Sequence, residues 1–293
     1  MSNQDNFLDL SNINITSNLL LSENDFPVLR GLTPLSLRIL NASARLIQVA
    51  KGVEVLHEGD SARDLSFIRS GRVSIAKESG AQRKILAHLN KGDVYGEFGI
   101  LRNKARYASV YSTEHCEIIR IDAAAVQQVL DADKQFKTQL NKILSQRILN
   151  SFFFSHPIFQ TLSEDFRQQL SLSLEMRPFH RDARLFTQGE KPKGITLIIS
   201  GSVEIYCFDH NKHESLVEVR RDHDVLGELA TQQGKELAYS AVAATDLDTL
   251  QLDLHAMKLI KQIHTETFKR LELYINKRAQ LTASRLKEQA SDL

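Results

Sequence analysis

Residues 93–97 read Asp93-Val94-Tyr95-Gly96-Glu97, and residues 224–228 read Asp224-Val225-Leu226-Gly227-Glu228, 131 positions later. Other landmarks repeat in the same order: Leu32-Thr33-Pro34 with Leu162-Ser163-Glu164, Gly59 with Gly189, Gly71 with Gly201, and Ile121-Asp122 with Leu252-Asp253. The offset is 130 up to Gly71 and 131 from Asp93 onward, which one inserted residue explains. Self-similarity of this kind indicates a duplication, in which two copies of one unit follow each other.

Each copy is predicted to begin with a helix, continue through short strands and end with a helix. Thr33 and Ser163 are placed to cap the first helix of each copy, and Asp122 and Asp253 the last one. Turn residues separate the strands at roughly eight- to twelve-residue intervals, which is typical of an antiparallel sandwich or barrel. In the first copy the predicted strands are Val53–His57, Leu65–Arg69, Arg72–Ala76, Lys84–His88, Tyr107–Ser112 and Glu117–Ile121. The predicted fold class is mainly β with flanking helices (α+β).

The predicted domains are an N-terminal tail (1–25), the first copy (26–150) and the second copy with a C-terminal helix (151–293). The tail carries apolar clusters and either docks on the folded body or binds a partner. The residues after Asp253 predict one amphipathic helix, Met257 to Lys287, rather than an appended DNA-binding domain. Its basic residues are expected to form a solvated face: Lys277, Arg278, Arg285 and Lys287.

Composition excludes several classes of protein. The 37 Lys and Arg nearly balance the 36 Asp and Glu, so neither a nucleic-acid partner nor a polybasic membrane anchor is expected. Cys116 and Cys207 stand far apart without metal-ligand spacing, which predicts free, buried cysteines. The chain opens with no signal-peptide pattern and contains no apolar run of membrane-spanning length. We therefore expect a cytoplasmic protein.

A glycine-rich turn followed by an arginine marks the candidate site of the first copy. Gly96 and Gly99 bracket Glu97 and Phe98 just before a short predicted helix. Glycine lets the backbone approach a ligand closely, and successive N–H groups there can hold an anion. Arg106 lies nine residues after Glu97 and could fold back over the turn, where its planar guanidinium suits phosphate oxygens. Glu97 would then accept a hydrogen bond from a hydroxyl of the same ligand.

This stretch resembles the phosphate-binding cassette of the cyclic-nucleotide-binding domain family, in which Gly-Glu, a hydrophobic and a small residue precede an arginine. The two-copy layout is similar to the regulatory subunits of cAMP-dependent protein kinase. The resemblance implies a jelly-roll type β-barrel in each copy, with Glu97 on the ribose 2′-hydroxyl and Arg106 on the cyclic phosphate. The N–H groups of Phe98, Gly99 and Tyr107 would complete the phosphate cradle. The predicted ligand-binding residues are Gly96, Glu97, Phe98, Gly99, Arg106, Tyr107, Ala108 and Ser109.

The second copy keeps Gly227-Glu228-Leu229-Ala230 but has lost the arginine. Leu237 or Ala238 takes its place, and no arginine occurs between Leu229 and Lys269. Lys235 is the only cation identified near this cassette, and it lies short of the following strand. Truncating one partner of a buried charge pair typically costs about 2–5 kcal/mol of binding free energy. We therefore expect the second copy not to bind cyclic nucleotide.

One residue bears on which nucleotide the first copy would bind. Tyr107 stands where the family usually carries Ala, Ser or Thr, and threonine there is associated with cyclic GMP, so its absence favours cAMP. The bulky ring could instead shrink the pocket or contact the base, which leaves cGMP and cyclic di-GMP open. Phe152-Phe153-Phe154, in the connection between the copies, is expected either to cap the base or to pack between the copies.

The predicted function is a cytoplasmic cyclic-nucleotide sensor that signals to an unidentified effector protein. Ligand binding would shift the helix after Asp122, which leads into the second copy. An enzyme is not expected, because no catalytic triad, Walker loop or zinc motif is found, and neither a cofactor nor a metal is expected. His210 and His213 are interpreted as solvated residues of a hairpin tip. The alternatives are a ligand-free interaction scaffold on the same fold, a cyclic di-GMP receptor and, for the oligomeric state, a homodimer.

Overall fold

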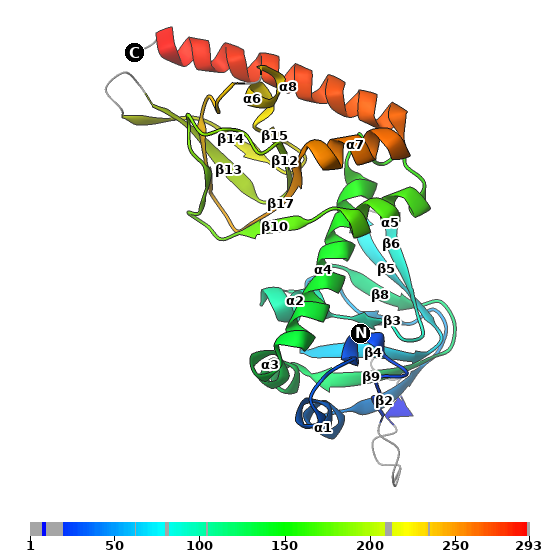
Figure 1. Ribbon diagram of the computed structural model, residues 1–293. Helices are drawn as coiled ribbons and strands as arrows, with labels where there is room; N and C mark the ends of the chain where they lie inside the picture. Colours follow the sequence, from blue (N-terminus) through cyan, green and yellow to red (C-terminus); the bar gives the residue numbers. More distant parts are fainter. Residues whose placement is uncertain are drawn as a thin grey trace. The chain divides into compact units, whose positions relative to one another are not determined.

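Figure 1 shows the computed structural model, which describes residues 8–9, 20–61, 63–79, 82–103, 105–208, 213–233 and 235–291. The chain divides into two compact units, residues 1–144 and residues 145–293. It passes from unit 1 into unit 2 within α4, Lys134–Ser155. Within the described ranges, no helix has an apolar stretch long enough to cross a membrane. His210 and most of the predicted tail lie outside these ranges.

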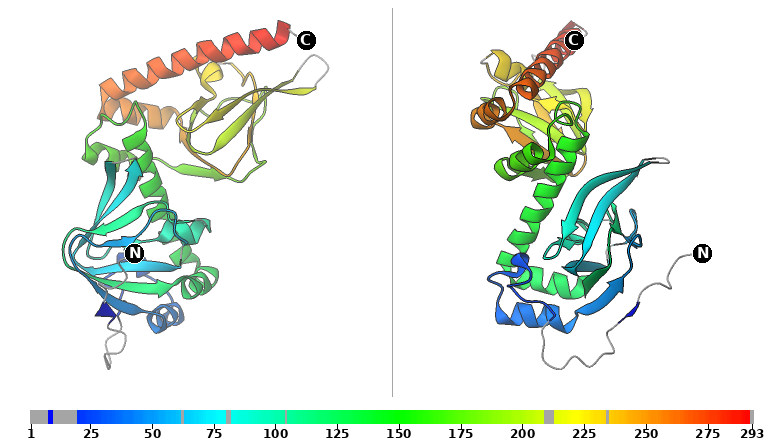
Figure 2. Two further views of the ribbon diagram at one scale, coloured as in Figure 1. Left: turned by 180° about the vertical axis from the view of Figure 1, so that it is seen from behind. Right: turned by 90° about the vertical axis from the view of Figure 1, so that its right-hand side faces the viewer.

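Unit 1 consists of two antiparallel sheets flanked by helices (Figures 1 and 2). Its five-stranded sheet has the order β1 (Leu8–Asp9), β2 (Arg45–Val49), β9 (Cys116–Asp122), β4 (Asp64–Ser70) and β7 (Val94–Tyr95). Its four-stranded sheet has the order β3 (Glu54–Leu56), β8 (Ser109–Ser112), β5 (Arg72–Ser79) and β6 (Gln82–Asn90). The helical elements that accompany them are η1 (Pro27–Leu29), α1 (Pro34–Ala42), α2 (Glu97–Arg102) and α3 (Ala123–Ala132).

Unit 2 repeats this architecture strand by strand. One sheet has the order β10 (Met176–Phe179), β17 (Leu247–Leu252), β12 (Ile195–Ser200) and β15 (Val225–Leu226), and the other β11 (Arg184–Phe186), β16 (Ser240–Ala243), β13 (Ser202–Phe208) and β14 (Glu214–Arg221). The helices are α5 (Glu164–Ser173), α6 (Glu228–Gln233), α7 (Leu254–Ile263) and α8 (Thr265–Ser291). The matching strand orders confirm the duplication and the fold class of antiparallel sheets with flanking helices.

Some strands differ from the predicted ranges. The hairpin of β5 and β6 extends beyond both predicted strands to the pair Ser79 and Gln82. The added residues are polar, so the apolar pattern used for the prediction did not include them. β8 begins only at Ser109, since residues 106–108 belong to the loop that carries the candidate site. β2, which pairs with β9 and was not predicted, buries Leu46, Ile47 and Val49, while Arg45 is exposed and Gln48 half-buried.

Helix caps follow the prediction at three of the four positions. Thr33, Ser163 and Asp253 each accept a hydrogen bond from the backbone N–H three residues later. Asp122 makes no such bond at the start of α3. Its carboxylate accepts a hydrogen bond from the Ser43 hydroxyl at 3.3 Å instead, because the end of α1 lies beside the end of β9.

The described end of the predicted tail is part of unit 1. Leu21 is fully buried in a core cluster that also contains Phe26 and Phe67. The Asn41 side chain accepts from the Leu21 N–H at 2.9 Å and donates to the Leu21 carbonyl at 3.1 Å. This short segment therefore docks on the folded body.

The cysteines are free, as predicted: Cys116 is buried, and Cys207 is half-buried. Burial raises the pKa of the Cys207 thiol to about 11, so this thiol stays protonated at neutral pH. Neither side chain has the exposed, electropositive surroundings that make a cysteine reactive.

Two repeated glycines are explained by close backbone packing. Gly71 has φ +85°, and a Cβ there would meet the His115 carbonyl and lie 2.7 Å from Cys116 Sγ. Its counterpart Gly201 has φ +101°, and a Cβ would lie 2.5 Å from the Asp246 carbonyl. Any side chain at these turns would strain the backbone and collide with the neighbouring strand connection.

The phenylalanine cluster after residue 151 packs within unit 2. Phe152 and Phe153 are buried, and their rings lie 6.2 Å and 5.1 Å from that of Phe159. His156 completes the cluster and is buried too. The contacts found for these phenylalanines therefore build a helical sub-core of unit 2, whereas the sequence predicted a base cap or packing between the copies.

His156 is held as a neutral imidazole. Its Nδ1 accepts from the Ile158 N–H at 3.2 Å, and its Nε2 lies 3.3 Å from the His223 carbonyl, which fits a proton on Nε2 only. Burial, together with the neighbouring His223 ring, lowers the pKa of His156 to about 4 from the ordinary 6.5. Protonation would break the bond from Ile158 and bury a charge.

We predict that acid destabilises unit 2 through His156. The unfolded histidine binds a proton near pH 6.5 and the folded one near pH 4, so stability is complete above pH 6.5. The free energy of unfolding should fall by about 3 kcal/mol as the pH drops from 6.5 to 4. Urea titrations of His156→Phe should show a flatter pH profile over this range. His180→Phe, which removes a fully exposed histidine, is the control, and an equal flattening in both variants would contradict the prediction.

We predict that Gly71→Ala lowers the free energy of unfolding by about 2–4 kcal/mol, because strain and overpacking add. Gly52→Ala is the matched control: Gly52 has φ +84°, but a Cβ there would meet nothing within 4 Å. Its cost should be confined to backbone strain, about 1–2 kcal/mol. Chemical denaturation measures both, and equal costs would show that the close contact at Gly71 contributes nothing.

Candidate functional site

The predicted glycine turn of unit 1 is built around a buried arginine. Gly96 has φ +92° and directly precedes α2. A Cβ at this position would lie 2.6 Å from Arg106 Nη1 and 3.0 Å from the Asp64 carbonyl oxygen. Glycine is required here because the guanidinium packs directly against the backbone. The structure thus brings Arg106 back over the Gly96 turn, as the spacing suggested.

Arg106 is held rigidly and keeps one donor unused. The residue is 4% exposed; Nη1 donates to the Gly96 carbonyl, and Nη2 to the carbonyl and the carboxylate of Asp64, all at 2.9 Å. Its Nε is buried and has no hydrogen-bond partner among the described residues. A buried donor without an acceptor is costly, so an acceptor oxygen of a ligand fits at this position. A phosphate oxygen has the charge and geometry for it.

Asp64 is a site residue that the sequence did not reveal. It opens β4 and is the counter-charge of Arg106, with a side chain 17% exposed. An aspartate at the start of a strand is common and carries no motif. Only the pairing of β4 with β7 beside the glycine turn places it against the guanidinium.

The backbone of the arginine is fixed by two further bonds. Arg106 N–H donates to the Asp60 carbonyl at 2.7 Å, and Gly59 N–H donates to the Arg106 carbonyl at 2.9 Å. These bonds tie the arginine loop to the turn that contains the repeated Gly59. Glu97, at the first position of α2, is buried and 5% exposed. The predicted carboxylate thus directly follows Gly96, whose carbonyl accepts from Arg106.

Tyr107 faces an aromatic and basic environment. Its ring lies 4.8 Å from the Phe98 ring, centroid to centroid, and Lys77 Nζ lies 4.0 Å from the Tyr107 centroid. Lys77 also pairs with Glu58 at 3.4 Å. Tyr107 is 37% exposed, so its ring lines the surface beside the turn rather than the core. This arrangement presents a flat aromatic face and a cation next to Arg106.

The remaining predicted site residues are buried and structural in their contacts. Ala108 and Ser109 have little exposed surface. The Ser109 hydroxyl accepts from the Glu58 N–H at 2.9 Å, which fixes the end of β3. Gly99 lies within α2 and is also buried. Of the predicted set, Gly96 and Arg106 are in direct contact, as are Phe98 and Tyr107.

In unit 2, Leu237 occupies the place of Arg106. Leu237 N–H donates to the Glu190 carbonyl, and Gly189 N–H donates to the Leu237 carbonyl, both at 2.8 Å, which repeats the bonds of Arg106. The sequence left Leu237 and Ala238 as alternatives. The side chain is 5% exposed and lines a cavity of about 100 Å³ with Gly227 and Thr196. The guanidinium of unit 1 is thus replaced by an aliphatic group.

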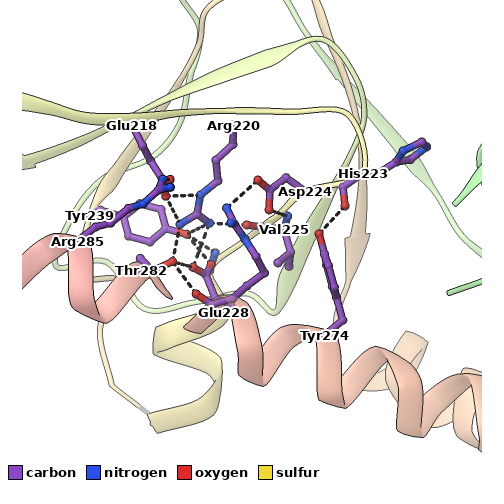
Figure 3. Close-up of polar contacts among 12 residues, drawn as sticks. Glu218, Arg220, His223, Asp224, Val225, Glu228, Tyr239, Tyr274, Thr282 and Arg285 are labelled. Atoms are coloured by element: carbon purple, nitrogen blue, oxygen red, sulfur yellow. Dashed lines mark hydrogen bonds and ion pairs between the residues drawn. The ribbon is translucent and has the colours of Figure 1, made fainter. Parts of the chain in front are cut away.

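A different arginine reaches the cassette of unit 2 (Figure 3). Arg220, on β14, is fully buried, and its Nη1 lies 3.0 Å from Glu228 Oε1. The prediction that Lys235 is the only cation near this cassette is therefore wrong. It considered residues after Glu228, whereas Arg220 precedes the cassette and arrives through strand pairing. Burial alone lowers the pKa of Arg220, but Tyr239 and the carboxylates of Glu228 and Asp224 raise it above its usual value, so the guanidinium stays charged.

The single helix predicted from Met257 to Lys287 is divided, because α7 ends at Ile263 and α8 begins at Thr265. The predicted basic face lies on α8 and is only partly solvated. Lys277 and Lys287 are exposed. Arg278 pairs with Asp224 at 2.7 Å and its side chain is 17% exposed, and Arg285 forms an ion pair with Glu218, whose side chain is 8% exposed. The prediction is wrong for Arg278, because the turn after β14 supplies Asp224 as its partner, whereas the Arg285 side chain stays 49% exposed beside Glu218.

Comparisons with known proteins find two copies of one domain family in the chain. The cyclic nucleotide-binding domain family matches residues 46–133 and 176–263. The chain is 26% identical over 166 residues to a cAMP-dependent protein kinase regulatory subunit of Mycosarcoma maydis, covering 57% of this chain and 30% of the relative. It is 26% identical over 195 residues to a cGMP-dependent protein kinase of Drosophila melanogaster, covering 66% of this chain and 17% of the relative. The chain thus spans less than a third of the length of either relative.

Solved structures of related proteins were also found. One is the regulatory domain of Toxoplasma gondii PKA with cAMP, at 20% identity and TM-score 0.38, covering 86% of this chain and 92% of that one. Another is the regulatory subunit of a cAMP-independent protein kinase A from Trypanosoma cruzi bound to guanosine, at 17% identity and TM-score 0.40, covering 92% and 94%. The two family matches cover more than half of the chain and coincide with the two repeated units. The chain belongs to the cyclic nucleotide-binding domain family and carries two tandem copies of that domain.

Proposed function

We propose that the chain is a regulatory sensor that binds one cyclic mononucleotide, with cAMP favoured, in unit 1. The observation that carries this proposal is the buried Arg106, oriented by Asp64 and Gly96 and left with an unused Nε donor. The unused Nε can donate to an oxygen of the ligand phosphate, and Asp64 and Gly96 hold the guanidinium in place for it. The relatives named above include kinase regulatory subunits, which supports a regulatory role rather than catalysis.

The signal would leave unit 1 through its last helices. α3 ends at Ala132 and α4 begins at Lys134, and Asp133 between them accepts from the N–H groups of Thr33, Gln135 and Phe136. Burial alone would raise the pKa of Asp133, but these hydrogen bonds hold it below its usual value, so the Asp133 carboxylate between the two helices stays ionised. A ligand that moves the Gly96 turn would shift α3 in its packing on β4 and β9, and the continuous α4 would carry the shift into unit 2.

A ligand-free interaction scaffold is the second candidate. The packing of Tyr107 on Phe98 and the loss of the arginine in unit 2 favour it, because both reduce what the cassettes offer a nucleotide. A receptor for cyclic di-GMP is the third candidate. Direct titration with the nucleotides distinguishes the scaffold and the cyclic di-GMP receptor from the cAMP sensor.

We predict that calorimetric titration with cAMP, cGMP and cyclic di-GMP shows one binding site per chain, for cAMP. Arg106→Ala should weaken that binding by roughly 30-fold to several thousand-fold, because a buried phosphate loses its charge partner. Arg69→Ala, which removes a partly exposed cation from β4 of the same unit, is the matched control and should leave the affinity unchanged. If none of the three ligands produced binding heat, the ligand-free scaffold would be the better proposal. Two binding sites per chain would contradict the expectation that unit 2 does not bind nucleotide.

We predict that Tyr107→Thr shifts selectivity toward cGMP. The tyrosine hydroxyl sits at the far end of a ring packed on Phe98, whereas a threonine hydroxyl would lie beside the cassette backbone. One added hydrogen bond to the guanine amino group should change the ratio of the two dissociation constants by about tenfold. Competition titrations measure the ratio, with Tyr107→Val as the control of equal shape without the hydroxyl. An equal shift in both variants would show that ring removal alone decides selectivity.

A further inference from the structure

Glu228, in the cassette of unit 2, is fully buried and has every oxygen engaged by its own chain. Thr282 of α8 donates to Oε1 at 2.5 Å, and Tyr239 donates to Oε2 at 2.7 Å. Arg220 Nη1 lies 3.0 Å from Oε1. The Tyr239 hydroxyl in turn accepts from the Gly227 N–H at 2.8 Å, so the glycine turn itself is tied into the network. Figure 3 shows these groups converging on the carboxylate.

Arg220 is the centre of this network. Its Nη2 donates to Thr282 Oγ1 at 2.6 Å, its Nε donates to Glu218 at 2.8 Å, and its Nη1 also donates to the Val225 carbonyl. Arg285 of α8 pairs with the same Glu218. Two arginines thus balance two glutamates, which is the condition under which charges can be buried without a large penalty.

Three substitutions relative to unit 1 create the arrangement together. β14 pairs Arg220 with Val203 where β6 pairs Leu89 with Val73, so Arg220 stands in the place of Leu89. By the register of β16 and β8, Tyr239 stands in the place of Ala108. Leu237 stands in the place of Arg106. Unit 2 has therefore exchanged the cassette arginine for an arginine and a tyrosine that both point to its own glutamate.

α8 is fitted to this cassette along one face. Tyr274 donates to the His223 carbonyl at 2.9 Å, Arg278 to Asp224 at 2.7 Å and Thr282 to Glu228. These residues are spaced by four, so they lie on one side of the helix. Leu286, four residues further, packs against the core cluster that contains Tyr239. Successive turns of α8 therefore bind His223, Asp224 and Glu228, which lie in and just before the cassette.

We propose that α8 is a built-in partner of the Gly227-Glu228 turn in the second cassette, latched there by Thr282 and Arg220 on Glu228. The Thr282 hydroxyl takes the hydrogen bond on the glutamate that unit 1 would offer to a ligand hydroxyl, a comparison that rests on the proposed function. The latch itself rests only on contacts within unit 2. It holds α8 closed without any small molecule, so unit 2 keeps one conformation when the nucleotide level changes.

The latch is tested by amide hydrogen exchange on the full chain without nucleotide. Thr282→Val keeps the shape of the side chain and removes the hydroxyl that links Arg220 to Glu228. Loss of a hydrogen bond to a charged group should speed exchange in peptides covering residues 270–287 by about tenfold or more. Thr267→Val is the matched control: it makes the same change at a buried position of α8 whose hydroxyl has no hydrogen-bond partner among the described residues. It should stay within about threefold of the unmodified chain.

Equal exchange in Thr282→Val, Thr267→Val and the unmodified chain would overturn the proposal. Glu228→Gln, which keeps the shape and removes the charge, is the second variant should Thr282→Val fail to fold. It should accelerate exchange in the same peptides, and unchanged exchange would likewise overturn the latch. Because nucleotide is absent throughout, failure here is distinguishable from failure of the titration that tests unit 1.

Discussion

Each unit buries one arginine guanidinium against its Gly-Glu turn, and the partners of that guanidinium decide what the unit can do. Burying a charge is tolerated only when hydrogen bonds and counter-charges replace the lost water. In unit 1 Asp64 and the Gly96 carbonyl orient Arg106 but leave its Nε without an acceptor. In unit 2 Arg220 donates to groups of the chain from Nε, Nη1 and Nη2. The first arrangement is open to a ligand oxygen, and the second is complete.

The same constraint explains the glycines and the helices around each turn. A side chain at position 96 would displace the guanidinium, so the turn must be glycine. In unit 2 a cation that arrives from β14 needs further acceptors on the open side of the cassette, and α8 supplies the Thr282 hydroxyl there. The two proposals together describe a regulatory pair from one duplicated fold, in which one copy would respond to a ligand and the other would hold a fixed structure. The proposed signal passes between them along α4, which contributes residues to both units.

Several features could be predicted from local sequence because their causes are local. Thr33, Ser163 and Asp253 cap the helices that follow them, since capping involves residues three apart. The repeated Gly71 and Gly201 mark turns where a side chain would collide with the neighbouring backbone. Asp122 departed from this pattern because a competing partner, Ser43, comes from another element. Phe152 and Phe153 likewise contact a residue outside the short predicted motif, Phe159 of unit 2.

Repeats and short motifs along the chain were enough to predict the duplication, the antiparallel sheets with flanking helices, and the positions of Gly96, Glu97 and Arg106. The groups that contact those residues became known only from the folded chain. Asp64, Arg220, Tyr239 and Thr282 come from different strands and helices, and none carries a motif. Their roles arise when strand pairing and helix docking bring distant residues together, and buried charges make the identity of those partners decisive.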